Sequence, residues 1–184
     1  MAVLRRATVG LAALMFGLAT LVFTAGPADA AGPYCGLVWG SQGEASGDYG
    51  RAPLGKVRTG RHECFDRVVF EVDGAAAGYR VEYVPEVRTE GEGAVLPLAG
   101  GAFLRVVVMA NVFDDLGHLH YDARVGDRLN VKGYKTLRDV KYGGCFEGQS
   151  TFGVGVRARL PFRVFTLDGP GDHSRIVLDV AHRW

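Results

Sequence analysis

Short runs in which apolar and polar residues alternate cover most of the chain after residue 66. In residues 67–73, Val68, Phe70 and Val72 fall on one face and charged residues fall on the other. This period of two residues predicts a β-strand with one buried face. Six further runs have the length and composition of strands: residues 79–83, 103–109, 137–146, 151–158, 162–167 and 175–180. The run 103–109 is nearly all apolar, which predicts a central strand with both faces covered.

Glycine and proline separate these runs at residues 100–101, 160–161 and 168–171. Gly143-Gly144 interrupts the run 137–146 and predicts a bulge. No stretch after residue 30 keeps a 3.6-residue period over three turns, and residues 41–61 and 111–130 are predicted to be long connections. About seven short strands without crossover helices predict an all-β fold, a single antiparallel β-sandwich. A closed barrel is the alternative.

Two of the predicted strands share one residue pattern. Residues 66–72 and 174–180 both have the order polar, Arg, aliphatic, Val, apolar, acid, Val. Each strand therefore carries an arginine and an acid on its outer face. If the two strands pair antiparallel, the arginine of one lies opposite the acid of the other.

The first thirty residues differ from the rest and predict an export signal. Arg5 and Arg6 precede an uncharged run over residues 7–23, and Ala28-Asp29-Ala30 provides the small residues that a signal peptidase requires. No cysteine follows the apolar run closely enough for a lipid anchor. We therefore expect a signal peptide, with a signal helix, over residues 1–30 and a mature domain over residues 31–184. The mature protein is expected to be secreted and to have no membrane anchor.

Cleavage of the signal changes the net charge. The 21 basic and 20 acidic residues become 19 of each, because Arg5, Arg6 and Asp29 leave with the signal. A neutral domain has no long-range field that would attract nucleic acid or an anionic membrane, so neither is an expected partner. Nucleotide cofactors are not expected outside the cytoplasm, and we predict no cofactor.

The chain has three cysteines, Cys35, Cys64 and Cys145. In an exported protein two of them are expected to pair. A bond between Cys35 and Cys64 would close a loop of about 30 residues and would contribute roughly 3–4 kcal/mol by reducing the entropy of the unfolded chain. Cys145 would then be a small buried thiol in a strand, since no CxxC motif or neighbouring base indicates redox chemistry.

Several segments resemble the AMIN-like domain of secreted and lipid-anchored actinobacterial proteins. These segments are residues 35–41, 60–67, 146–153, 155–164 and 175–184. Through this family the chain is similar, more remotely, to the AMIN domain, a β-sandwich that targets amidases and secretion machinery to peptidoglycan. The resemblance implies a Cys35–Cys64 disulfide and a surplus Cys145. It also implies binding to the cell envelope, although nothing in this chain resembles an attached amidase or pore domain.

Polar and aromatic residues concentrate in the predicted hairpin 146–160. Glu147 and Gln149 share a face because they are two residues apart, as do Arg157 and Arg159. Planar polar groups beside aromatic rings are typical of a sugar or peptide site, although a cross-strand ion pair on the sheet surface would give the same pattern. The candidate ligand-binding residues are Phe146, Glu147, Gln149, Arg157 and Arg159, with Phe152 as a second ring.

Two histidine-containing segments are interpreted as structural. His118 and His120 lie near Asp114, Asp115 and Asp122, and two imidazoles with a carboxylate suit a transition metal. No known ligand motif supports this, so we predict a solvated polar loop and no metal. A second histidine stands next to a cysteine and two acids in the segment His62-Glu63-Cys64-Phe65-Asp66, where a disulfide favours a structural role over a catalytic base.

No catalytic residues are predicted. Ser150 lacks the Gly-x-Ser-x-Gly pattern of a nucleophile elbow. We therefore expect a secreted, non-enzymatic module that binds the cell wall, with peptidoglycan or another wall glycan as its partner. A protein-interaction or inhibitor domain that binds an envelope protein is the alternative, and a hydrolase is less favoured.

Overall fold

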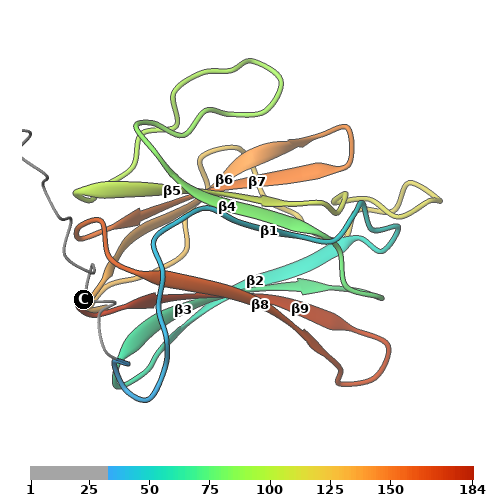
Figure 1. Cartoon of the computed structure of the whole chain (residues 1–184). Helices are drawn as coiled ribbons and strands as arrows, with labels where there is room; N and C mark the ends of the chain where they lie inside the picture. Colours follow the sequence, from blue (N-terminus) through green and yellow to red (C-terminus); the bar gives the residue numbers. More distant parts are fainter. Residues whose placement is uncertain (1–32) are drawn as a thin grey trace, which may run out of the picture. The chain divides into compact units, whose positions relative to one another are not determined.

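The computed structural model describes residues 33–184, and the predicted signal peptide lies outside the described residues. The described chain forms two antiparallel sheets that pack as a sandwich (Figure 1). This confirms the predicted all-β class and rules out the closed barrel. The strands are β1 Glu44–Ser46, β2 Leu54–Arg61, β3 Phe65–Val72, β4 Tyr79–Val84, β5 Ala102–Val108, β6 Leu137–Phe146, β7 Gln149–Val156, β8 Phe162–Asp168 and β9 Ser174–Ala181. Among the described residues no helix is long and apolar enough to cross a membrane.

The strands divide into sheets of five and four. The five-stranded sheet has the order β1-β4-β5-β7-β6, and the four-stranded sheet has the order β2-β3-β9-β8. All seven strands that the sequence predicts are present, each within two residues of its expected bounds. β5 is the central strand of its sheet, as its apolar run predicts, but the prediction that both of its faces are covered is wrong, because Arg105 is exposed on the outer face. The register shift between Tyr142 and Gly144 confirms the bulge in β6.

The apolar faces of the two sheets form one core. Val68, Phe70 and Val72 of β3 are fully buried there, as the period of two residues predicts. The ring centroid of Phe70 lies 5.0 Å from that of Phe152, so aromatic side chains from both sheets meet in the centre. Residues 111–130 form the predicted long connection, which leads from β5 to β6.

The prediction that residues 41–61 form a connection without strands is wrong. This segment contains β1 and β2, and β2 pairs with β3 along the edge of the four-stranded sheet. The alternation in β2 is hidden because a register shift lies between Leu54 and Lys56. Leu54 and Val57 are both buried although they are three residues apart, which a period of two does not allow.

The repeated strand pattern correctly predicts a pairing. β3 and β9 are antiparallel neighbours, and Arg67 lies opposite Asp179. The Arg67 guanidinium donates from Nε and Nη2 to the two Asp179 carboxylate oxygens, at 2.6 and 2.9 Å. The second predicted pair, Glu71 and Arg175, is in register but forms no ion pair, because Glu71 accepts from Arg58 instead.

The disulfide between Cys35 and Cys64 is present. It attaches the segment before β1 to the turn between β2 and β3. Cys145 is a free, half-buried thiol in β6, where Sγ lies 3.4 Å from the Asn111 side-chain oxygen. The sequence therefore identifies the correct pair among the three cysteines.

Candidate functional site

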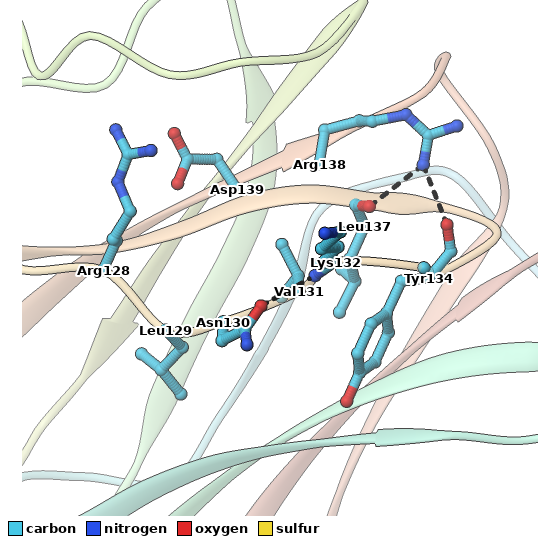
Figure 2. A pocket seen from close by; sticks show the side chains of 10 residues that line it. Arg128, Leu129, Asn130, Val131, Lys132, Tyr134, Leu137, Arg138 and Asp139 are labelled. Carbon is cyan, nitrogen blue, oxygen red and sulfur yellow. Dashed lines mark hydrogen bonds between the residues drawn. The ribbon is translucent and has the colours of Figure 1, made fainter.

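A surface cavity lies beside the edge strand β6. It has a volume of about 630 Å³ and is lined by residues 128–134 and 137–139 (Figure 2). We call it the cationic groove. Leu129, Val131 and Tyr134 form an apolar floor that packs against the core. A cavity of this volume is large enough for a small ligand or one unit of a polymer.

The groove exists because residues 126–134 first follow β6 and then leave it. The Leu129 N–H donates to the Val140 carbonyl at 2.9 Å, and the Tyr142 N–H donates to the Asp127 carbonyl at 2.9 Å. These bonds satisfy the free edge of β6, which would otherwise expose unpaired backbone groups. The chain then turns at Asn130 and Gly133, where the Asn130 side chain accepts from the Lys132 N–H at 3.0 Å. The turn holds the groove open between the loop and the strand.

Contacts with the four-stranded sheet fix the far end of the groove. The Tyr134 hydroxyl donates to Thr59 Oγ1 of β2 at 2.9 Å. Asp66 of β3 is almost fully buried, and its Oδ2 accepts from the backbone N–H groups of Thr136, at 2.5 Å, and Leu137, at 3.1 Å. A buried carboxylate that receives two N–H bonds holds the start of β6 in place.

Three exposed cations surround the groove. Arg128, Lys132 and Arg138 form no ion pair within residues 33–184. Arg138 donates from Nη1 to the carbonyls of Tyr134 and Leu137, at 3.1 and 3.0 Å, which orients its guanidinium (Figure 2). The acid of the groove, Asp139, is buried and lies 3.5 Å from the Lys141 ammonium. The groove therefore presents positive charge that is not neutralised locally.

The structure separates the five predicted ligand-binding residues into two groups. Phe146, Glu147 and Gln149 lie at the tip of the β6–β7 hairpin, where Phe146 is exposed and Glu147 has a positive φ of 49°. The exposed Tyr49 ring packs over Gly148 of this turn. The hairpin tip thus carries two aromatic rings beside an exposed carboxylate.

Arg157 and Arg159 follow the other end of β7, so they do not join the hairpin tip. Arg157 Nη2 donates to the His182 carbonyl at 2.7 Å, and the Arg159 guanidinium lies 4.7 Å from the Tyr83 ring centroid. Phe152, predicted as a second aromatic platform, is instead fully buried in the core. The two-residue spacing within each pair does not show that an eight-residue strand separates the two groups.

The His118 and His120 side chains bind carboxylates. His118 Nδ1 lies 2.9 Å from Asp114 Oδ2, and His120 lies between Asp73 Oδ2, at 2.8 Å, and Asp114 Oδ2, at 3.3 Å. His173 Nδ1 is 3.3 Å from Asp73 Oδ1. In the described part of the chain no group of three or more His, Cys, Asp and Glu residues is arranged to hold a metal ion. These contacts connect the 111–130 loop to the end of β3.

This arrangement predicts a pH-dependent loop. Hydrogen bonds to Asp73 and Asp114 raise the pKa of His120 above 6.5. The protonated imidazole donates to both carboxylates, so the loop is held fully below pH 6.5 and is released as the pH rises through the raised pKa. We expect hydrogen-exchange protection factors at the His118 and His120 amides to fall over this interval.

The variant His120→Gln is the matched control for this prediction. Glutamine keeps a donor for one carboxylate but does not titrate, so its loop protection should be independent of pH. The role of His120 would be contradicted if the protection factors of the unmodified protein did not change with pH. It would also be contradicted if they changed equally in the variant.

His62 and Ser150 have structural environments. His62 stacks on Phe65 with ring centroids 4.5 Å apart, and burial lowers its pKa, with the nearby Arg67 charge acting in the same direction. The buried Ser150 hydroxyl donates to the Ala110 carbonyl at 2.8 Å. The stacking of His62 agrees with its structural interpretation.

The cationic groove is the feature that the sequence reasoning missed. Its signal is the excess of basic residues between positions 124 and 141, where six lysines and arginines stand against two aspartates. A net charge of zero for the mature domain hides this local excess, because acids elsewhere in the chain balance it.

Two antiparallel sheets, a disulfide and a groove bordered by three exposed cations define an all-β sandwich domain. The model of the AMIN-like domain matches residues 52–182, and the chain belongs to this family. The match confirms the resemblance over β2 to β9. No curated protein and no solved structure matches the chain.

Proposed function

We propose that this protein is a secreted, non-enzymatic module that binds the cell wall through the cationic groove. The observation that carries the proposal is a cluster of three unpaired cations, Arg128, Lys132 and Arg138, above an apolar floor. The AMIN-like family and a disulfide agree with a role outside the cytoplasm.

The proposed ligand is peptidoglycan or another anionic wall glycan. Such polymers carry carboxylates or phosphates beside the flat, weakly apolar faces of sugar rings. The guanidinium and ammonium groups would receive the anionic groups, and Tyr134 with Val131 would contact the sugar face. Because the mature domain has no net charge, binding depends on these local contacts and not on long-range attraction.

A sedimentation assay with purified cell walls tests this proposal. We expect the mature domain to bind, and Arg128→Glu/Lys132→Glu/Arg138→Glu to weaken binding by at least about tenfold, because each surface ion pair contributes up to about 1 kcal/mol. Binding of the unmodified domain should weaken with added salt. The control Arg51→Glu/Lys56→Glu/Arg80→Glu makes the same change in net charge at exposed positions outside the groove.

Equal losses in both triple variants would contradict the groove as the site, and no sedimentation at low salt would contradict wall binding. A second candidate surface is the hairpin tip with Phe146, Glu147 and Gln149, favoured by the exposed rings of Phe146 and Tyr49. Binding that survives the groove variant but is lost in Phe146→Ala would assign the ligand to this tip.

A further inference from the structure

A second cavity, of about 410 Å³, lies at the opposite end of β3 from Asp66. It is lined by the outer-face residues Arg58 of β2 and Glu71 of β3, by Arg175 of β9, and by Asp73 and His173 in the adjoining turns. We call it the β9 cavity. It shares no lining residue with the cationic groove. Ligand binding in the β9 cavity is therefore independent of wall binding at the cationic groove.

Unpartnered polar atoms are concentrated at this cavity. Within residues 33–184, the buried side-chain polar atoms that have no hydrogen-bond partner are Ser174 Oγ and Arg175 Nε. Both residues line the β9 cavity. A buried donor without an acceptor is costly, so its persistence in a native fold requires an explanation such as a bound ligand.

Arg175 lacks a carboxylate partner although an acid stands next to it. Glu71 is its cross-strand neighbour, but the Oε1 atom of Glu71 accepts from Arg58. Among the described residues, the Arg175 side chain donates to the Asp168 carbonyl alone, from Nη2 at 3.2 Å. Its planar guanidinium therefore keeps paired donors that suit an external carboxylate.

The acidic residues of the cavity determine which charged groups a ligand can carry. Asp73 already receives His120 and His173, whereas Glu71 Oε2 has no partner among the described residues. An open carboxylate oxygen beside an open guanidinium repels a dianion such as phosphate. Glu71 and Arg175 are directly opposed in an antiparallel pair, so their Cβ atoms are only about 5 Å apart. The two side chains are therefore complementary to a ligand that carries an ammonium close to a carboxylate.

We propose that the β9 cavity binds the carboxylate and ammonium groups of a free amino acid or of a short peptide. Arg175 binds the carboxylate, and Glu71 binds the ammonium. The volume of about 410 Å³ accommodates one or two small residues. His173 also lines the cavity and adds an imidazole to its polar wall.

Titration of the mature protein with alanine, alanyl-alanine, N-acetylalanine, alaninamide and inorganic phosphate tests this site. We expect alanine or alanyl-alanine to shift the NMR signal of the Arg175 Nε–H group. N-acetylalanine lacks the ammonium and alaninamide lacks the carboxylate, so both should bind at least about tenfold more weakly, which corresponds to the loss of one charged hydrogen bond. Binding of alanine alone identifies an amino acid site, and binding of alanyl-alanine alone identifies a peptide site.

The variants Arg175→Gln and Glu71→Gln should each weaken binding at least about tenfold, and Arg51→Gln is the matched control at an exposed position. The NMR shift in the unmodified protein keeps the test valid if a variant does not fold. The proposal is overturned if no zwitterion at 20 mM (roughly 2 kcal/mol of affinity) shifts the Arg175 signal. It is also overturned if phosphate or N-acetylalanine binds as well as alanine does.

Discussion

Replacing Asp179 with alanine is expected to lower the free energy of unfolding by about 3 kcal/mol, near the lower end of the range for breaking a buried ion pair. The Asp179 side chain is fully buried, whereas Arg67 and Arg163 keep 22% and 29% of their side-chain surface exposed. The variant leaves two guanidinium groups without their shared acceptor. Their partial exposure to water limits the loss.

The environment of Asp179 supports this size of effect. Arg163 donates from Nε and Nη2 to Asp179 Oδ2 at 3.0 and 2.8 Å, in addition to the paired bonds from Arg67. Both guanidinium groups also lie within 6 Å of aromatic ring centroids, with Arg163 4.9 Å from Phe165 and Arg67 5.2 Å from Phe65. Loss of the carboxylate therefore disturbs a layer that covers the outer face of the four-stranded sheet.

Urea unfolding followed by tryptophan fluorescence measures the effect. The control is Glu82→Ala, which removes the acid of the exposed Arg105–Glu82 pair, and it should cost less than about 1 kcal/mol. If Asp179→Ala were as stable as the control, the ion pairs around Asp179 would not contribute to stability as we expect.

Loss of the Cys35–Cys64 disulfide is expected to lower the free energy of unfolding by about 3–4 kcal/mol. The bond joins residues separated by 29 positions, and it restricts the unfolded chain accordingly. In the folded state it also holds the segment that contains Trp39, whose ring centroid lies 5.8 Å from that of Phe65 and 5.4 Å from the Arg163 guanidinium. When the bond is absent, the Trp39 segment keeps its backbone hydrogen bonds to Phe162 but loses its covalent attachment to the turn before β3.

The double variant Cys35→Ser/Cys64→Ser, compared with and without a reducing agent, tests this prediction. The free energy of unfolding of the double variant should equal that of the reduced unmodified protein and should not change when the reducing agent is added. Cys145→Ser is the matched control, and it should change stability by less than about 1 kcal/mol because this thiol is free and only half-buried. Equal effects of all these changes would contradict a specific contribution of the disulfide.

Most strands follow from the sequence because one face of each strand meets the core. Residues 79–83 show this clearly: Tyr79 and Val81 are buried and Arg80 between them is exposed, as the alternation predicts. The sequence does not predict β2, because its bulge places Leu54 and Val57 three residues apart on the buried face, which breaks the two-residue period. A strand at a sheet edge can take this form because its neighbour, β3, supplies the register.

The candidate site is less accessible from sequence. The sequence shows that Arg128 and Arg138 are basic residues. It does not show the groove between them, which depends on how residues 126–134 follow β6 and then leave it. In the β9 cavity, Glu71 and Arg175 are separated by about a hundred positions and meet only through strand pairing. The repeated strand pattern predicts that these two residues oppose each other, but it does not show that Arg58 binds the Glu71 carboxylate.

The sequence by itself determined the fold class, the cysteine pair, the family resemblance and the opposition of Arg67 to Asp179, since each depends on a local pattern of residue types. The tertiary structure alone decided that Asp179 is fully buried, that Phe146 and Arg157 lie apart, and which cations remain unpaired. The physical reason is that burial and charge pairing depend on the second sheet and on covering loops, and these approach each strand from distant parts of the chain.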